Sequence, residues 1–126
     1  MRYTLLLHYT EPTDDELGPE LIAEGQRAFS SYAEALHRAG VLIGAEVLQP
    51  STNTTTLTTA DGGLRVQDGP FADTKEQLGG TFVIDVPDLD AAIEWARQAP
   101  PLAWGGVLEI RPGATHTVEG VWTPNE

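Results

Sequence analysis

Residues 2–9, RYTLLLHY, predict a β-strand that is apolar on both faces, because aliphatic and aromatic side chains occupy both alternating sets of positions. Apolar strands of the same kind are expected over 81–86 and 107–110. A sheet built from such strands needs cover on both faces, since soluble monomers rarely expose an apolar face of several hundred Å². The other elements of the chain, or a partner, must supply that cover.

Two helices are expected to provide part of it. The first runs from about Pro19 to Ala39, with Gly18 as its N-cap and Gly40 directly after its end. The second is capped by Asp88 and ends before Pro100-Pro101. Their buried positions recur every three or four residues. These positions are Ile22, Gly25, Phe29, Ala33 and Leu36 in the first helix, and Leu89, Ala92, Ile93 and Ala96 in the second.

A further strand and a hairpin lie between the helices. The strand covers 41–48, and the hairpin pairs 54–59 with 64–67 around the turn Asp61-Gly62-Gly63. Without the hairpin, the element order is β-α-β-β-α-β. This order predicts an α+β protein with the ferredoxin-like split β-α-β fold and an inserted hairpin.

One domain is expected over 1–112, followed by an irregular or short-stranded C-terminal tail over 113–126. The two helices can cover only one face of the predicted sheet. We therefore expect the other face to be buried against a second copy of the chain. The predicted assembly is a homodimer that forms a dimeric α+β barrel.

The composition narrows the classes of partner. Of 126 residues, 19 are acidic and 7 are Lys or Arg, which gives a net charge of −12. Such a charge repels phosphate backbones and anionic lipids, so neither nucleic-acid nor membrane binding is expected. The absence of cysteine excludes disulfides, thiolate metal sites and a cysteine nucleophile. No apolar stretch is long enough for a signal peptide or a membrane span, and a cytoplasmic protein is expected.

A loop and its flanking segments carry the most specific motif of the chain. The motif is VQDGPFADTKEQLGG over 66–80, followed by IDVPDLDAA over 84–92. It resembles the DGPF branch of the YCII-related protein family, and the resemblance extends over about 1–112. The resemblance implies a ferredoxin-like fold and a dimeric α+β barrel, in agreement with the element order.

The resemblance implies less about activity. Relatives are similar in fold to muconolactone isomerases, and some carry a His–Asp pair suggested as an active site. Members of the DGPF branch are often encoded near extracytoplasmic-function sigma factors, which implies a regulatory context. A shared fold does not by itself supply a function.

His8 is the main catalytic candidate, because it lies at the end of a predicted central strand among apolar residues. If Leu6 faces the barrel interior, alternation places His8 there as well, where an imidazole suits acid–base catalysis. Glu46 within an apolar strand and Asp68 at the start of the motif loop are the candidate catalytic acids. A dyad of His8 with either acid is one hypothesis, and a histidine bonded to a backbone carbonyl is the other.

Phe71, Lys75 and Glu76 in the motif loop are the candidate ligand-binding residues. Lys75 and Glu76 suit the rim of a pocket as well as a solvated surface, and Phe71 suits a core or dimer contact as well as a ligand. Asp68-Gly69-Pro70 also has a structural explanation, because these residue types form tight turns. The three histidines lack the spacing of metal ligands, and no metal or other cofactor is expected.

Three functions remain open at this point. The first is an isomerase- or lyase-like enzyme that moves protons in a small-molecule pocket. The second is a non-catalytic ligand-binding or regulatory module, linked to extracytoplasmic-function sigma factor signalling. The third is a dimeric protein-interaction domain without pocket chemistry. A pocket lined by His8, Glu46 and the motif loop would favour the first two.

Overall fold

The computed structural model describes all 126 residues, except for the side chain of Asp14. Its elements follow the predicted order, and the C-terminal tail forms a second hairpin. The strands are β1 (Arg2–Tyr9), β2 (Leu42–Val47), β3 (Thr55–Ala60), β4 (Gly63–Asp68), β5 (Gln77–Asp85), β6 (Val107–Pro112), β7 (Thr115–Val118) and β8 (Val121–Pro124). The helices are α1 (Asp14–Arg38) and α2 (Leu89–Ala96), with short 3₁₀ helices η1 (Ser51–Asn53) and η2 (Pro100–Trp104).

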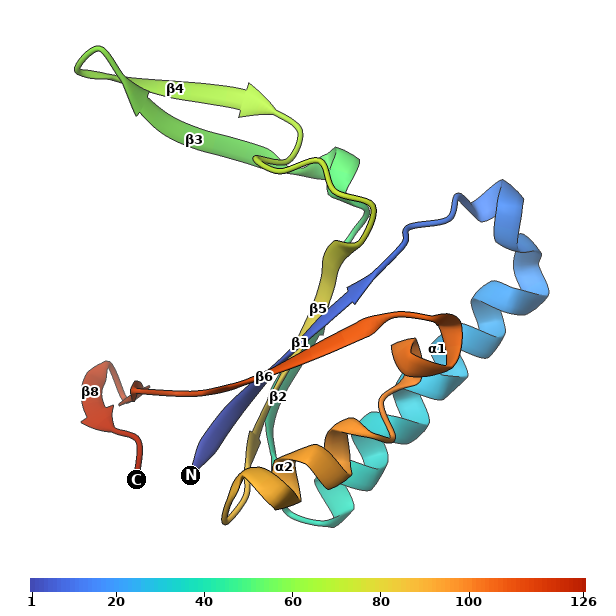
Figure 1. Cartoon of the computed structure of the whole chain (residues 1–126), viewed down its shortest axis with the longest axis vertical. Helices are drawn as coiled ribbons and strands as arrows, with labels where there is room; N and C mark the ends of the chain where they lie inside the picture. The colour runs from blue at the N-terminus through green and yellow to red at the C-terminus, as the bar shows by residue number, and fades with distance from the viewer.

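Four strands form the main sheet in the order β2-β5-β1-β6, and every neighbouring pair is antiparallel. This is the strand order of a ferredoxin-like fold, with β1 and β5 in the centre, and it confirms the predicted α+β class. Figure 1 shows both helices on one side of the sheet and both hairpins on the other. Among the described residues, no helix is long and apolar enough to cross a membrane.

The core lies between the helices and the side of the sheet that faces them. The ring centroid of Phe82 lies 6.4 Å from that of Phe29, in a stacked pair, and 5.1 Å from that of Tyr32, edge to face. Such aromatic pairs stabilise a core beyond the burial of their area. The buried apolar residues of the central strands and of the helices are Tyr3, Leu5, Leu7, Phe82, Ile84, Tyr32, Leu36, Ala92 and Ala96.

The first helix begins earlier than the sequence predicts. Thr13 caps a short helical turn by accepting a hydrogen bond from the backbone N–H of Glu16. Gly18 then interrupts the helix with a φ of 75° and a ψ of 163°. The main helix therefore starts at Pro19, as expected, because Gly18 adopts a left-handed φ and proline suits the first helical position.

A bulge distorts the pairing of the two central strands beside Gly79. Leu7 pairs with Gly80, whereas His8 pairs with Leu78, so Gly79 is the extra residue of β5. The Tyr9 ring covers Gly79, and its hydroxyl donates a hydrogen bond of 3.1 Å to the carbonyl of Gly79. Burial, together with the charge of Glu11, raises the pKa of Tyr9. The bulge thus fixes the end of β1 at which His8 lies.

The C-terminal hairpin is fastened to the start of β1. The Asn125 side chain donates a hydrogen bond to the Arg2 carbonyl and accepts one from the Arg2 N–H, at 2.9 and 2.8 Å. The same amide donates to the carbonyl of Gly113. The chain after Pro112 is thus short-stranded, one of the two forms expected for it.

Replacing Tyr32 by Phe tests the packing of α1 on α2. The Tyr32 hydroxyl donates a 2.8 Å hydrogen bond to the Trp95 carbonyl, so we expect a loss of about 1 kcal/mol of unfolding free energy at pH 8. Burial raises the pKa of Tyr32 from 10.0 to about 12. The unfolded chain therefore releases this proton first, and the contribution of Tyr32 is lost as pH rises from 10 through about 12. Urea unfolding at pH 8 and pH 11 should show the gap between parent and variant shrinking. A gap that widens at pH 11 would contradict the assignment.

Replacing Gly79 by Ala tests the bulge. The added Cβ would overlap the ring of Tyr9, so we expect a loss of about 2 kcal/mol in unfolding free energy. Gly63→Ala is the matched control, because its nearest neighbour would be the Ala60 carbonyl oxygen at 3.7 Å. Thermal or urea unfolding of both variants is the measurement. Equal effects at the two positions would show that the Tyr9 contact is unimportant.

Candidate functional site

His8 lies on the face of the sheet that no helix covers. The alternation of β1 places Leu5 and Leu7 in the core, each 0% exposed, and therefore directs Leu6 and His8 to the opposite face. In the pairing of β1 with β6, Leu6 lies opposite Glu109 and His8 opposite Val107. Glu109 thus shares the helix-free face with His8, one diagonal step away.

His8 and Glu109 form the closest acid–base contact of this face. Nε2 of His8 lies 2.7 Å from Oε1 of Glu109, and the two side chains are 25% and 63% exposed. The carboxylate does not satisfy hydrogen-bond geometry with the ring, and Nε2 is enclosed without a hydrogen-bond partner among the described residues. The contact is therefore a close ion pair when the imidazole is protonated.

The enclosure of Nε2 decides which ring nitrogen can meet a ligand. Glu109 occupies the side of Nε2, whereas Nδ1 is not among the enclosed side-chain atoms that lack a partner. A carboxylate on one ring nitrogen orients the imidazole and stabilises its protonated form. The other nitrogen is then placed to give or take a proton. Any acid–base chemistry of this pair would therefore use Nδ1 of His8.

The structure does not bring His8 together with the acids considered from the sequence. Glu46 lies on the same face, because it pairs with Thr81, which in turn pairs with Leu6. Glu46 belongs to the edge strand β2, however, and β5 lies between β2 and β1. The strands that carry Glu46 and His8 are therefore two strand spacings apart, roughly 10 Å in total. Asp68 ends β4 in the projecting hairpin. Within the described part of the chain, neither acid lies within ion-pair distance of His8, and the same holds for Glu76.

Sequence reasoning passed over Glu109 as a partner, although a signal for it exists. Glu109 is a lone acid between the apolar residues Leu108 and Ile110, which is the same pattern that singled out Glu46. The antiparallel register of β6 on β1 selects between the two acids. That register depends on tertiary pairing, which no local pattern reveals.

Hydrogen bonds to backbone carbonyls hold the motif loop and its start. Gly69 has a φ of 96°, donates its N–H to the Thr54 carbonyl at 2.8 Å, and accepts the Thr56 hydroxyl on its own carbonyl. The side-chain amide of Gln77 donates to the carbonyls of Ala72 and Thr74. These bonds give Gly69 and Gln77 a structural role, and the backbone bends at Gly69 without a hydrogen-bonded turn.

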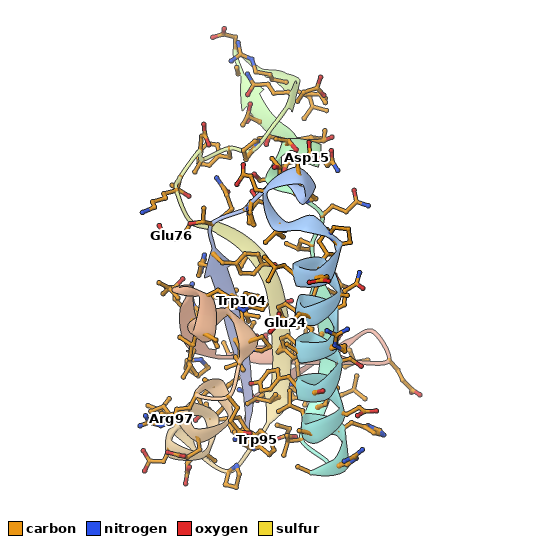
Figure 2. The ribbon with its side chains drawn as sticks, turned by 90° about the vertical axis from the view of Figure 1, so that its right-hand side faces the viewer. Asp15, Glu24, Glu76, Trp95, Arg97 and Trp104 are labelled. Carbon is orange, nitrogen blue, oxygen red and sulfur yellow. The ribbon has the colours of Figure 1, made fainter. Side chains whose placement is uncertain are left out.

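The three candidate ligand-binding residues are all exposed. Phe71 is 86% exposed, and Lys75 and Glu76 lie on the surface of the same loop. Figure 2 shows Glu76 on this loop, apart from α1 and from the Trp95 and Trp104 side chains that lie beside the helices. None of the three lines the hollow beside α1 or the hollow between β2 and β5.

Two open hollows on the surface lie away from His8. One follows α1 along Pro19, Glu20, Ala23, Glu24 and Arg27. The other lies where β2 leaves the sheet and β5 enters it, and Leu48, Ser51 and Leu78 are among its walls. Neither is lined by His8 or Glu109. Within the described side chains, no group of three or more potential metal ligands is found.

Replacing Glu109 by Gln tests the pairing of His8. The change removes the charge 2.7 Å from Nε2, so we expect the ¹⁵N signals of the His8 ring to shift in NMR spectra at neutral pH. Glu46→Gln is the matched control on the same face and should leave those signals in place. A larger response to Glu46→Gln than to Glu109→Gln would overturn the assignment of the pair.

Comparisons with known proteins agree with this architecture. The chain is 35% identical over 119 residues to an uncharacterised protein of Rhizobium meliloti (strain 1021). The alignment covers 92% of this chain and 94% of that relative. Residues 1–112, from the first strand of the main sheet to its last, match the YCII-related domain. The protein is therefore a member of the YCII-related domain family.

Proposed function

We propose that this YCII-related protein binds a small molecule on the helix-free face of its sheet and that His8 and Glu109 transfer a proton to or from it. The observation that carries the proposal is the 2.7 Å contact of these side chains on a face that no helix covers. The reaction class that fits is an isomerase- or lyase-like proton transfer. Such chemistry needs a positioned acid–base group and no bound metal.

The residues act in distinct roles. Glu109 places a carboxylate oxygen 2.7 Å from Nε2 of His8. Nδ1 of His8 takes a proton from a carbon or oxygen of the ligand and returns it at a second position. Leu6 and Val107 lie beside the pair on the same face and supply apolar contact. Glu46, on the far edge of the face, and the motif residues Asp68, Phe71, Lys75 and Glu76 belong to the rim of the site in this proposal.

A second copy of the chain completes the pocket. In one chain the helix-free face is open, and neither the hollow beside α1 nor the hollow between β2 and β5 includes His8. A homodimer that brings the two helix-free faces together would enclose the pair in a cavity between the copies and separate it from bulk solvent. The motif Asp68-Gly69-Pro70-Phe71 supports placing the protein in the DGPF branch, for which the same dimeric barrel is implied.

A non-catalytic role in ligand binding or regulation is the second candidate. The lack of a hydrogen bond to Nε2 of His8 among the described residues favours it, because no contact in the single chain then fixes the orientation of the ring. In this case the ligand would bind the same face without reacting. The link of the DGPF branch to extracytoplasmic-function sigma factors would then give the bound state a regulatory meaning.

Protein-detected NMR of the ¹⁵N-labelled chain, titrated with a library of small hydroxy acids, keto acids and lactones, tests the proposal. Bound compounds should shift the backbone signals of Leu6 and Thr81, which share the face with His8. His8→Gln should weaken binding at least about 10-fold, since it removes the central polar contact. His37→Gln is the matched control, because His37 is an exposed histidine in the last turn of α1.

Deuterium exchange separates the two candidates. An acid–base site should exchange a carbon-bound hydrogen of its ligand with D₂O, and Glu109→Gln should slow that exchange by about 100-fold. Binding without exchange in the parent protein would favour the regulatory role. Binding that is indifferent to His8→Gln would exclude both uses of the face.

A further inference from the structure

The β3–β4 hairpin projects from the body on the helix-free side of the sheet (Figure 1). It makes a sheet of two strands only, and neither strand joins the main sheet. A two-stranded hairpin is marginally stable in water when nothing packs on it. Its projection therefore needs a physical explanation.

One face of this hairpin is apolar. Leu57 pairs with Val66, and Leu64 lies two residues before Val66 on the same face. Their exposed fractions are 59%, 61% and 67% in the order Leu57, Val66, Leu64. The opposite face carries the pair Thr58 and Arg65. The hairpin thus has the one-sided pattern of a strand pair that packs against something.

The hairpin is held in place at its base. The Glu11 carboxylate accepts hydrogen bonds from the backbone N–H and the hydroxyl of Ser51, in η1. On the other side of the base, Gly69 bonds to Thr54 and to the Thr56 hydroxyl. The Glu11–Ser51 bonds tie the segment before the hairpin to the segment that follows β1, and the Gly69 bonds close the base of the hairpin itself.

The exposed area of the whole chain points to a partner. A compact monomer of 13.6 kDa is expected to expose about 6,600 Å², whereas this chain exposes 8704 Å². The excess is roughly 2,100 Å², or roughly 4,200 Å² when two copies each bury it, which is the size of an obligate dimer interface. A partner needed at all times and in equal amount is most simply the same chain.

The second hairpin fits the same occupant. β7 and β8 project on the same side of the sheet as β3 and β4 (Figure 1). They expose Val121 and Trp122 at 67% and 70%. Two projections with exposed apolar side chains therefore stand on the side of the sheet that the helices leave open.

We propose that the β3–β4 hairpin is an arm that packs its face of Leu57, Leu64 and Val66 against a second copy of the chain. Each copy gives one arm and receives one, as a two-fold axis requires. This proposal rests on the proposed function in one respect: the second copy that the arm contacts is the same copy that covers His8. The packing itself is independent of any ligand.

Sedimentation velocity of the full chain without ligand tests the arm. The variant Leu57→Thr/Val66→Thr keeps the threonine-rich, β-favouring character of the hairpin and removes two apolar side chains from each copy. We expect its dimer dissociation constant to rise at least about 100-fold. Thr58→Ser/Arg65→Thr, at the neighbouring register pair on the other face, is the matched control and should dimerise like the parent.

Two results would overturn the proposal that the hairpin is a dimer arm. One is a parent protein that sediments as a monomer at micromolar concentration, and the other is a dissociation constant unchanged by Leu57→Thr/Val66→Thr. Far-UV circular dichroism of the variants should match that of the parent, which separates a loss of dimer from a loss of fold. Failure of the proposed function looks different, because His8→Gln would then leave ligand binding intact while the arm variants still dissociate.

Discussion

The alternation of side chains along β1 is the constraint on which the rest of the structure depends. β1 lies between β5 and β6, so both of its edges are paired and its side chains alternate between the two faces of the sheet. One set of its side chains must enter the core under the helices, and the other set must point away from them. Leu5 and Leu7 fill the core. Leu6 and His8 are therefore presented on a face for which the chain has no further helix.

Much of the fold can be predicted from the sequence because local patterns determine it. Gly18-Pro19 marks the start of the main helix, Asp88 caps α2 through the Ala91 N–H, and Gly40 takes a φ of 74° after α1. The turn Asp61-Gly62 closes the hairpin, with positive φ at both residues. The sequence pattern does not predict the first turn of α1, because its cap, Thr13, precedes the glycine that interrupts the helix.

The site could be predicted only in part, because half of it depends on pairing between distant segments. Strand alternation alone directs His8 to the helix-free face. The choice of Glu109 as its neighbour follows from the register of β6, which is about 100 residues away in the sequence. Glu46 has the same local pattern and the same face, but its strand β2 is separated from β1 by β5. A lone acid in an apolar strand therefore indicates a face, and the strand order decides the partner.

The charges on the helix-free face limit how a second copy can pack there. Glu46 and Glu109 lie at the two ends of one row across the sheet, and Arg111 lies opposite Thr4 in the next row. Burying such groups in a dry interface costs several kcal/mol per unpaired ion. The centre of a dimer is therefore better left hydrated, with apolar contact supplied at the periphery. The exposed Leu57, Leu64 and Val66 of the arm meet that requirement. A dimer held together at its periphery by these side chains would leave a polar cavity around His8 at its centre.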